Sequence, residues 1–130
     1  MKQFRVLALA AAVIFFAASC KKDKIDNPTG GDASIIGTWN ISHILTIEPN
    51  NDRYDYPGEA GDYMEFNNDG TMFTKVQEYE KSEDYQMLDA THLKKGGNDA
   101  DLKDLTNNKA ALHIPPHNGQ PEDITYFLTK

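Results

Sequence analysis

The most constraining feature of the sequence is the alternation of apolar and polar residues from Ile35 to Ile47. One side of an extended chain would carry Trp39, Ile41, His43, Leu45 and Ile47. The other side would carry polar residues, with Ile44 as the exception. A period of two is typical of a β-strand with one buried face. The pattern predicts a long strand with His43 on its inward face.

Further short runs of β-forming residues follow this strand. They cover residues 63–66, 71–80, 85–88, 91–94, 102–106, 110–114 and 124–129. Turn-forming Asn, Asp and Gly residues separate several of them, as in Asn67-Asn68-Asp69-Gly70 and Gly96-Gly97-Asn98-Asp99. About eight short strands joined by tight turns predict an all-β fold, either a sandwich or an up-and-down barrel. Residues 79–93 lack Gly and Pro, so a helix is the alternative there.

An apolar run near the N-terminus ends at the single cysteine of the chain, Cys20. Lys2 and Arg5 precede the run, and a charged stretch beginning at Lys21 follows it. This order is that of a secretory signal. The run of roughly 13 residues is too short for a permanent membrane span, which needs about 20. An ordinary secretory leader with an incidental cysteine and an uncleaved anchor are the two alternatives.

The segment Ala17-Ala18-Ser19-Cys20 resembles the lipobox of bacterial lipoproteins. In that family the cysteine thiol receives a diacylglycerol, and the leader is cut just before it. The resemblance implies a signal peptide over residues 1–19, a lipidated cysteine with a polar tether over residues 20–34, and a folded domain over residues 35–130. The lipid, with palmitate-like acyl chains, would be the only covalent group, and no other cofactor is expected. Lys21 follows the cysteine, which favours the outer membrane, at the cell surface or the periplasmic face.

Net charge narrows the partners of the chain. Residues 1–19 contain two cations and no acid, so the remaining chain has 11 Lys and Arg against 20 Asp and Glu, a formal charge of −9. Nucleic-acid binding requires a basic surface, so nucleic acid is not an expected partner. Anionic lipid headgroups would repel such a chain, and membrane attachment therefore depends on the lipid anchor. With one cysteine no internal disulfide can form, and stability must come from a core.

The segment Gly37-Thr38-Trp39 resembles the Gly-x-Trp signature of lipocalins. Residues 66–71, Phe-Asn-Asn-Asp-Gly-Thr, are similar to a hairpin of small bacterial lipocalin-like lipoproteins. The resemblance implies an antiparallel, up-and-down, eight-stranded barrel whose first and last strands pair. It also implies a cation near the end of the last strand, over the signature tryptophan. Lys130 is the candidate for this cation, in contact with Trp39.

Candidate binding residues are few. His43 is either a polar contact inside a ligand cavity or a core histidine bonded to a neighbour. The segment from Glu48 to Asp62 predicts a loop, in which Tyr54 and Tyr56 would face a ligand as part of a lid. The alternative is a solvated loop without such a role. No His pair has a metal-ligand spacing and no second cysteine exists, so no metal site is expected.

Catalytic motifs are absent from the sequence, and we do not expect an enzyme. Two functions are compatible with the chain. The first is a lipid-anchored, lipocalin-like protein outside the cytoplasm that binds a small apolar or amphipathic ligand. The alternative is an accessory cell-envelope lipoprotein that binds a protein partner and no small ligand. An apolar cavity would favour the first, and a solid core with an exposed apolar patch the second.

Overall fold

The computed structural model describes residues 33–130. The predictions for the signal peptide, for Cys20 and for the tether up to residue 32 lie outside the described residues. The regular secondary structure assigned within residues 33–130 consists of β-strands only. They are β1 (Gly37–Ile47), β2 (Arg53–Pro57), β3 (Tyr63–Phe66), β4 (Thr71–Val76), β5 (Tyr79–Met87), β6 (His92–Lys95), β7 (Asn98–Lys103), β8 (Lys109–Ile114) and β9 (Asp123–Thr129). The helical alternative for residues 79–93 is therefore wrong. A search of residues 33–130 for a helix able to cross a membrane finds none.

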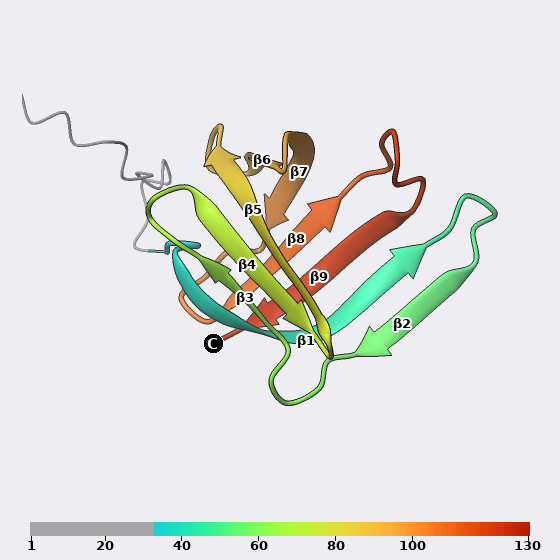
Figure 1. The fold of residues 1–130 in the computed structure, drawn as a ribbon, viewed down its shortest axis with the longest axis horizontal. Coiled ribbons are helices and arrows are strands. Elements are labelled where there is room, and N and C mark those ends of the chain that lie inside the picture. Colours follow the sequence, from blue (N-terminus) through green and yellow to red (C-terminus); the bar gives the residue numbers. More distant parts are fainter. Residues whose placement is uncertain (1–32) are drawn as a thin grey trace, which may run out of the picture.

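Eight of the strands form a closed antiparallel barrel (Figure 1). The order around the ring is β1-β3-β4-β5-β6-β7-β8-β9, and β9 pairs with β1 to close it. Each of these strands lies beside the next along the chain, except that β2 is skipped. The predicted all-β class and up-and-down eight-stranded barrel are confirmed, and the sandwich is excluded.

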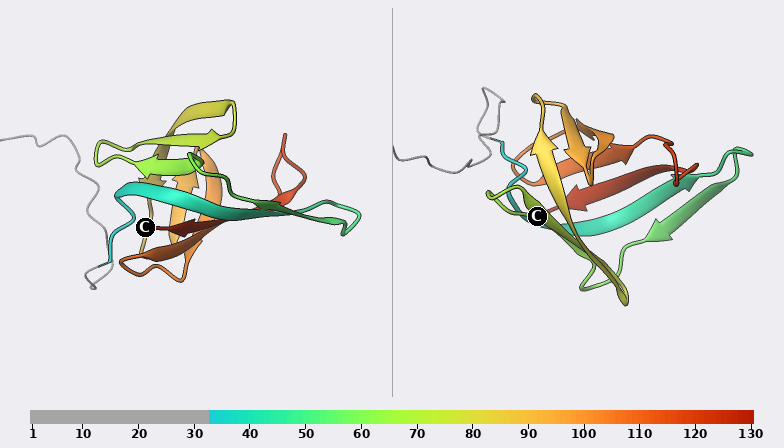
Figure 2. Two further views of the ribbon diagram at one scale, coloured as in Figure 1. Left: turned by 90° about the horizontal axis from the view of Figure 1, so that it is seen from below. Right: turned by 45° about the horizontal axis from the view of Figure 1, so that its top comes forward.

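The ninth strand, β2, was not predicted and extends the sheet beyond the barrel. β1 pairs with β3 through Gly37–Asn40 and with β2 through His43–Ile47, while β9 occupies its other edge. β2, β1 and β9 consequently continue past the closed ring as a projecting sheet, seen edge-on in Figure 2. The prediction of a loop from Glu48 to Asp62 is wrong over β2. That segment alternates only briefly, and its strand forms because the long partner β1 offers it a free edge.

A β-bulge at Ser42 changes which side chains of β1 face inward. Ile41 pairs with Leu128, and His43 pairs with Phe127, so Ser42 is an extra residue on β1. An extra residue reverses the alternation beyond it. Trp39 and Ile41 are buried in the barrel, and beyond the bulge Ile44 packs against the core. The prediction that His43 faces inward is therefore wrong, and the apparent exception, Ile44, is the inward residue.

The predicted strand over residues 71–80 is two strands. A two-residue turn, Gln77-Glu78, separates β4 from β5, with Val76 opposite Tyr79. Gln77 has a positive φ of 53° although it is not glycine. The sequence offers no Asn, Asp or Gly at this turn, so local turn chemistry does not indicate it. The turn predicted at Gly96-Gly97-Asn98-Asp99 is confirmed for Gly96 and Gly97, both at positive φ, whereas Asn98 and Asp99 belong to β7.

Large apolar side chains fill the barrel interior. The largest of those that are fully buried are Trp39, Phe66, Ile35, Met64, Met72, Leu93, Leu102, Leu112 and Leu128. Burying each such side chain contributes about 1.5–3 kcal/mol. The Phe66 ring meets the Tyr85 ring edge-on, with the centroids 5.2 Å apart. The closed part of the barrel is thus a packed core, and the barrel flares at the end that carries the β4–β5 turn and the projecting sheet (Figure 2).

Candidate functional site

A groove lies where the β4–β5 turn faces the projecting sheet. We call it the tyrosine groove. Its lining residues are Ile44 and Thr46 of β1, Tyr56 of β2, Val76 of β4, Gln77 of the turn, Tyr79 of β5, and Ile124 and Tyr126 of β9. Its volume is about 360 Å³. This volume falls within the roughly 300–1,000 Å³ common for small-molecule sites.

Strand register explains why these side chains gather on one face. Ile44 pairs with Tyr56 on one side and with Tyr126 on the other. Directly opposed residues of antiparallel strands point to the same face of a sheet. The bulge at Ser42 is what turns Ile44, and with it this whole row, toward the groove.

A buried carboxylate, Asp62, joins the two walls of the groove. Asp62 is 2% exposed. Its Oδ1 accepts a hydrogen bond of 2.7 Å from the backbone amide of Gln77. Its Oδ2 accepts bonds of 2.9 Å from both the Tyr56 hydroxyl and the Glu59 amide. Asp62 therefore holds the β4–β5 turn and Tyr56 in fixed positions.

The hydrogen bonds of Asp62 also set its charge. Burial by itself raises the pKa of this carboxyl, but the amides of Gln77 and Glu59 and the Tyr56 hydroxyl outweigh burial. The net pKa lies below the ordinary value of 3.8. Asp62 is consequently an anion at neutral pH, with its charge directed at protein donors.

Tyr56 and Tyr126 of the groove remain uncharged at neutral pH. Desolvation, reinforced by the carboxylate of Asp62, raises the pKa of Tyr56 to about 12. Desolvation, reinforced by the carboxylate of Glu83, raises the pKa of Tyr126 to about 12. The groove thus offers ring faces together with neutral hydroxyl groups, a surface suited to an amphipathic molecule.

The predicted ligand residues have separate places in the structure. Tyr56 lines the groove, and Tyr54 pairs with Thr46, so it extends the same face with 55% of its surface exposed. His43 lies on the opposite face, stacked on Phe127 with the ring centroids 3.9 Å apart. The groove brings the two tyrosines together and excludes His43.

Several residues of the groove are not identified by sequence reasoning. Ile44 breaks the alternation of its strand, and Asp62 is one of several acids in a predicted loop. Tyr126 carries a usable signal, because Ile124, Tyr126 and Leu128 alternate with other residues and are expected to share one face. Tyr79 carries none, since the turn that places it has no turn-forming residue.

The predicted structural signature is present at the opposite, closed end of the barrel. The Lys130 Nζ atom lies 4.3 Å from the centroid of the Trp39 ring. The Trp39 indole N–H donates a hydrogen bond of 2.6 Å to the Ile35 carbonyl. At Gly37, with a φ of 119°, a Cβ atom would come within 3.4 Å of Lys130 Nζ. These three residues close the barrel and lie away from the groove.

A chain of alternating carboxylates and imidazoles crosses the outer face of the barrel. His92 Nδ1 lies 2.9 Å from Asp89, and His92 Nε2 lies 3.7 Å from Asp101. His113 Nδ1 lies 3.2 Å from Asp101, and His113 Nε2 lies 2.9 Å from Asp123. At His92 this arrangement favours the protonated imidazole, because the hydrogen bond to Asp89, with attraction from Asp101, raises its pKa above 6.5.

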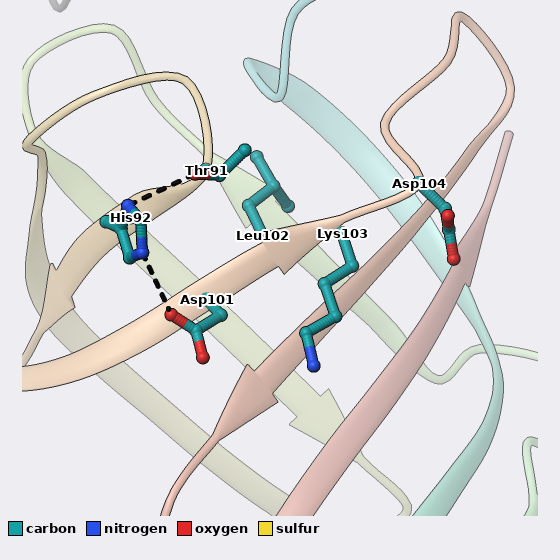
Figure 3. Close-up of a pocket in the computed structure, with 6 residues that line it drawn as sticks. All are labelled: Thr91, His92, Asp101, Leu102, Lys103 and Asp104. Carbon is teal, nitrogen blue, oxygen red and sulfur yellow. Dashed lines mark hydrogen bonds and ion pairs between the residues drawn. The ribbon is translucent and has the colours of Figure 1, made fainter.

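His92 and Asp101, two members of this row of carboxylates and imidazoles, border an open hollow, shown in Figure 3. Thr91, His92, Asp101, Leu102, Lys103 and Asp104 line it. Apart from the buried Leu102, the residues that line the hollow are all polar or charged. Within residues 33–130, no group of three or more His, Cys, Asp or Glu residues has an arrangement that could hold a metal ion. The row of carboxylates and imidazoles joins β6, β7, β8 and β9 by ion pairs, and the tyrosine groove is the candidate for ligand binding.

Comparisons with known proteins find no relative of this chain. No protein-family model matches it, and neither a curated protein nor a solved structure does. The candidate site therefore depends on its own geometry.

Proposed function

We propose that the protein is a lipid-anchored, lipocalin-like binder of a small amphipathic molecule, which it holds in the tyrosine groove. The main observation in favour of this proposal is the groove itself, which is about 360 Å³ in volume and is lined by tyrosine rings and aliphatic side chains. Because the barrel interior is filled by its own side chains, the ligand would lie at the flared mouth. The proposed role is non-catalytic.

The lipocalin-like assignment is supported by the closed end of the barrel. Gly37 and Trp39 stand at the start of β1, and Lys130 covers the tryptophan ring. The strand order and the β1–β9 pairing fit the same fold.

The anchored location is supported by the leader pattern and by the lipobox-like segment that ends at Cys20. The proposed location is the outer membrane, at the cell surface or the periplasmic face. We expect metabolic labelling with a palmitate analogue to mark the wild-type protein and to leave Cys20→Ser unlabelled. Labelling of both proteins would contradict the anchor. Protease treatment of intact cells would distinguish the two faces.

A protein partner is the second candidate function. It is favoured by the exposure of Tyr54 and Tyr79, which leave 55% and 57% of their surface in solvent beside the groove. Exposed aromatic residues next to an apolar hollow are also typical of protein interfaces. In this alternative the groove would receive a side chain of an envelope protein.

Native mass spectrometry of the protein purified from its own membrane fraction tests the first function. We expect a co-purified small molecule on the wild type. Its loss is expected in Thr46→Trp, which fills the groove, and not in Thr38→Trp, which adds the same side chain to the exposed outer face of β1. No small adduct on the wild type, or an adduct unaffected by Thr46→Trp, would contradict the proposal. A protein adduct lost in Thr46→Trp would support the second candidate.

A further inference from the structure

Three charged side chains face the inside of the barrel mouth. Lys81 pairs with Thr74, and Glu83 pairs with Met72, both of which are buried residues of β4. Lys95 of β6 pairs with the buried Tyr85 of β5. Paired residues share a face, so Lys81, Glu83 and Lys95 project toward the interior. We call these three residues the mouth cluster.

The ion pairs within the mouth cluster are close. Lys81 Nζ lies 2.7 Å from Glu83 Oε1, and Lys95 Nζ contacts Glu83 Oε2. The side chains of Glu83 and Lys95 are 10% and 14% exposed, whereas that of Lys81 is 50% exposed. One carboxylate thus neutralises two ammonium groups only in part, and the mouth cluster carries a net positive charge in an otherwise acidic chain.

The mouth cluster adjoins the tyrosine groove. Tyr79 lines the groove and precedes Lys81 by two residues, so both point to the same face of β5. Tyr126 lines the groove from β9, and the charge of Glu83 contributes to its raised pKa. The two features therefore form one surface, apolar at the projecting sheet and cationic toward the barrel.

Hydrogen-bond donors are also available there. The ion pair with Glu83 uses one of the three N–H groups of Lys81. Its cross-strand neighbour Thr74 is 3% exposed, and its Oγ1 has no hydrogen-bond partner among the described residues. A buried hydroxyl without a partner is unusual, because such a group costs free energy until it is bonded.

We infer that the ligand of the tyrosine groove is an anionic amphiphile, with its acidic head group on Lys81 and the mouth cluster and its apolar part along the tyrosines. This inference rests on the proposed binding function. Glu83 would compete with the head group for the two lysines, so the site would release its ligand more readily than one built from free lysines. The cationic mouth would also reject amphiphiles with an ammonium head group.

Isothermal titration calorimetry with three probes of equal chain length tests the inference: decanoate, decan-1-ol and decyltrimethylammonium, each below its aggregation concentration. We expect decanoate to bind at least about tenfold more tightly than decan-1-ol, the advantage of a charge-assisted hydrogen bond. We expect decyltrimethylammonium to bind most weakly. Equal affinities, or preference for the ammonium probe, would overturn the inference and leave the proposed function intact. Absence of binding by all three would overturn both.

Variants separate the head-group contact from general effects of charge. Lys81→Gln should remove most of the preference for decanoate over decan-1-ol. Lys94→Gln is the matched control, since Lys94 pairs with Asp99 on the outer face and its loss changes the net charge equally. Glu83→Gln should strengthen decanoate binding, because it removes the competing carboxylate. If Lys81→Gln and Lys94→Gln weaken decanoate binding equally, or if Glu83→Gln weakens it, the head-group assignment fails.

Discussion

Lys130 covers the ring of Trp39, which lies in β1, with the Nζ atom 4.3 Å from the ring centroid. The β1–β9 pairing produces this contact, because Asn40 lies opposite Thr129. The indole N–H is bonded to the Ile35 carbonyl on the chain entering β1. Trp39 therefore connects both ends of the folded region at the closed end of the barrel.

Replacing Trp39 by Ala should destabilise the barrel strongly. The side chain is fully buried in the core, and loss of a buried tryptophan costs about 3–5 kcal/mol. Urea unfolding followed by circular dichroism would measure the change. Trp39→Phe should be milder, because it keeps a six-membered aromatic ring in the core and loses the five-membered ring of the indole with its N–H. A Trp39→Ala protein with the wild-type midpoint would contradict the packing described above.

The cation over Trp39 is predicted to contribute much less than the ring. Lys130→Gln removes the charge from an exposed side chain, for which a cation–π contact contributes about 0.5–1 kcal/mol. Lys130→Arg should retain the stability, because guanidinium also stacks on aromatic faces. Unfolding midpoints of the two variants would be compared directly. Equal loss in both would show that the charge does not act through the ring.

Asp62→Asn should loosen the tyrosine groove. The amide keeps the shape of the side chain but replaces one accepting oxygen by a donor, so the Gln77 amide or the Tyr56 hydroxyl loses its partner. A buried donor without a partner costs about 1–3 kcal/mol. Hydrogen exchange should also become faster at Gln77. Asp52→Asn, at an exposed turn, is the control and should change stability by less than about 0.5 kcal/mol.

The charge of Asp62 gives this prediction a dependence on pH. The folded-state pKa lies below the ordinary 3.8, so the stabilisation is present above pH 3.8 and is lost as the pH falls through the folded value. Wild type should therefore lose stability on acidification more steeply than Asp62→Asn. Parallel curves for the two proteins would show that the carboxylate is not the group responsible.

How much of this structure can be predicted from the sequence depends on how far apart along the chain the interacting residues lie. The strands with clear alternation and the Gly96-Gly97 turn follow from local preferences, and the family resemblance supplied the β1–β9 closure. The bulge at Ser42 has no local signal, and a single extra residue reversed the faces assigned to His43 and Ile44. The turn at Gln77 is likewise held by Asp62, fifteen residues earlier in the chain. The groove is made from these two long-range features, which explains why Tyr56 was identified without its neighbours.

Gly58 should tolerate no side chain. A Cβ atom there would lie 1.8 Å from the Ile41 carbonyl oxygen, which is backbone and cannot move aside without breaking the β1 bulge. Gly58→Ala should therefore destabilise the projecting sheet and shift the amide resonances of β2. Gly61→Ala is the matched control: Gly61 has a φ of 98° and no atom within 4 Å of the position that a Cβ would occupy, so only backbone strain of about 1–3 kcal/mol is expected. A Gly58→Ala protein as stable as Gly61→Ala would contradict this close approach.

The contact between His92 and Asp89 should make stability depend on pH in a defined window. Bonding to Asp89, with further attraction from Asp101 and Asp99, raises the pKa of His92 above its ordinary 6.5. Hydrogen bonds from the Thr91 amide and from His92 lower the pKa of Asp89 from 3.8 to about 2. Because its pKa is raised in the folded state, the protonated His92 imidazole stabilises the fold fully below pH 6.5. This stabilisation decreases as the pH rises through the folded-state pKa. A lowered carboxyl pKa stabilises the fold above pH 3.8 and less as the pH falls toward 2. Both contributions are fully present between these limits.

Replacing His92 by Gln tests the upper pH limit of this window alone. His113 and the carboxylates of Asp89, Asp101 and Asp123 remain in this variant. Urea midpoints measured from about pH 5 to pH 9 should fall more steeply above pH 6.5 for wild type than for His92→Gln. His117→Gln is the control, since the Nδ1 atom of His117 contacts the Pro115 carbonyl and no carboxylate among the described residues. Its curve should follow that of wild type. If His92→Gln gives the wild-type slope, the ion pair with Asp89 does not stabilise the fold.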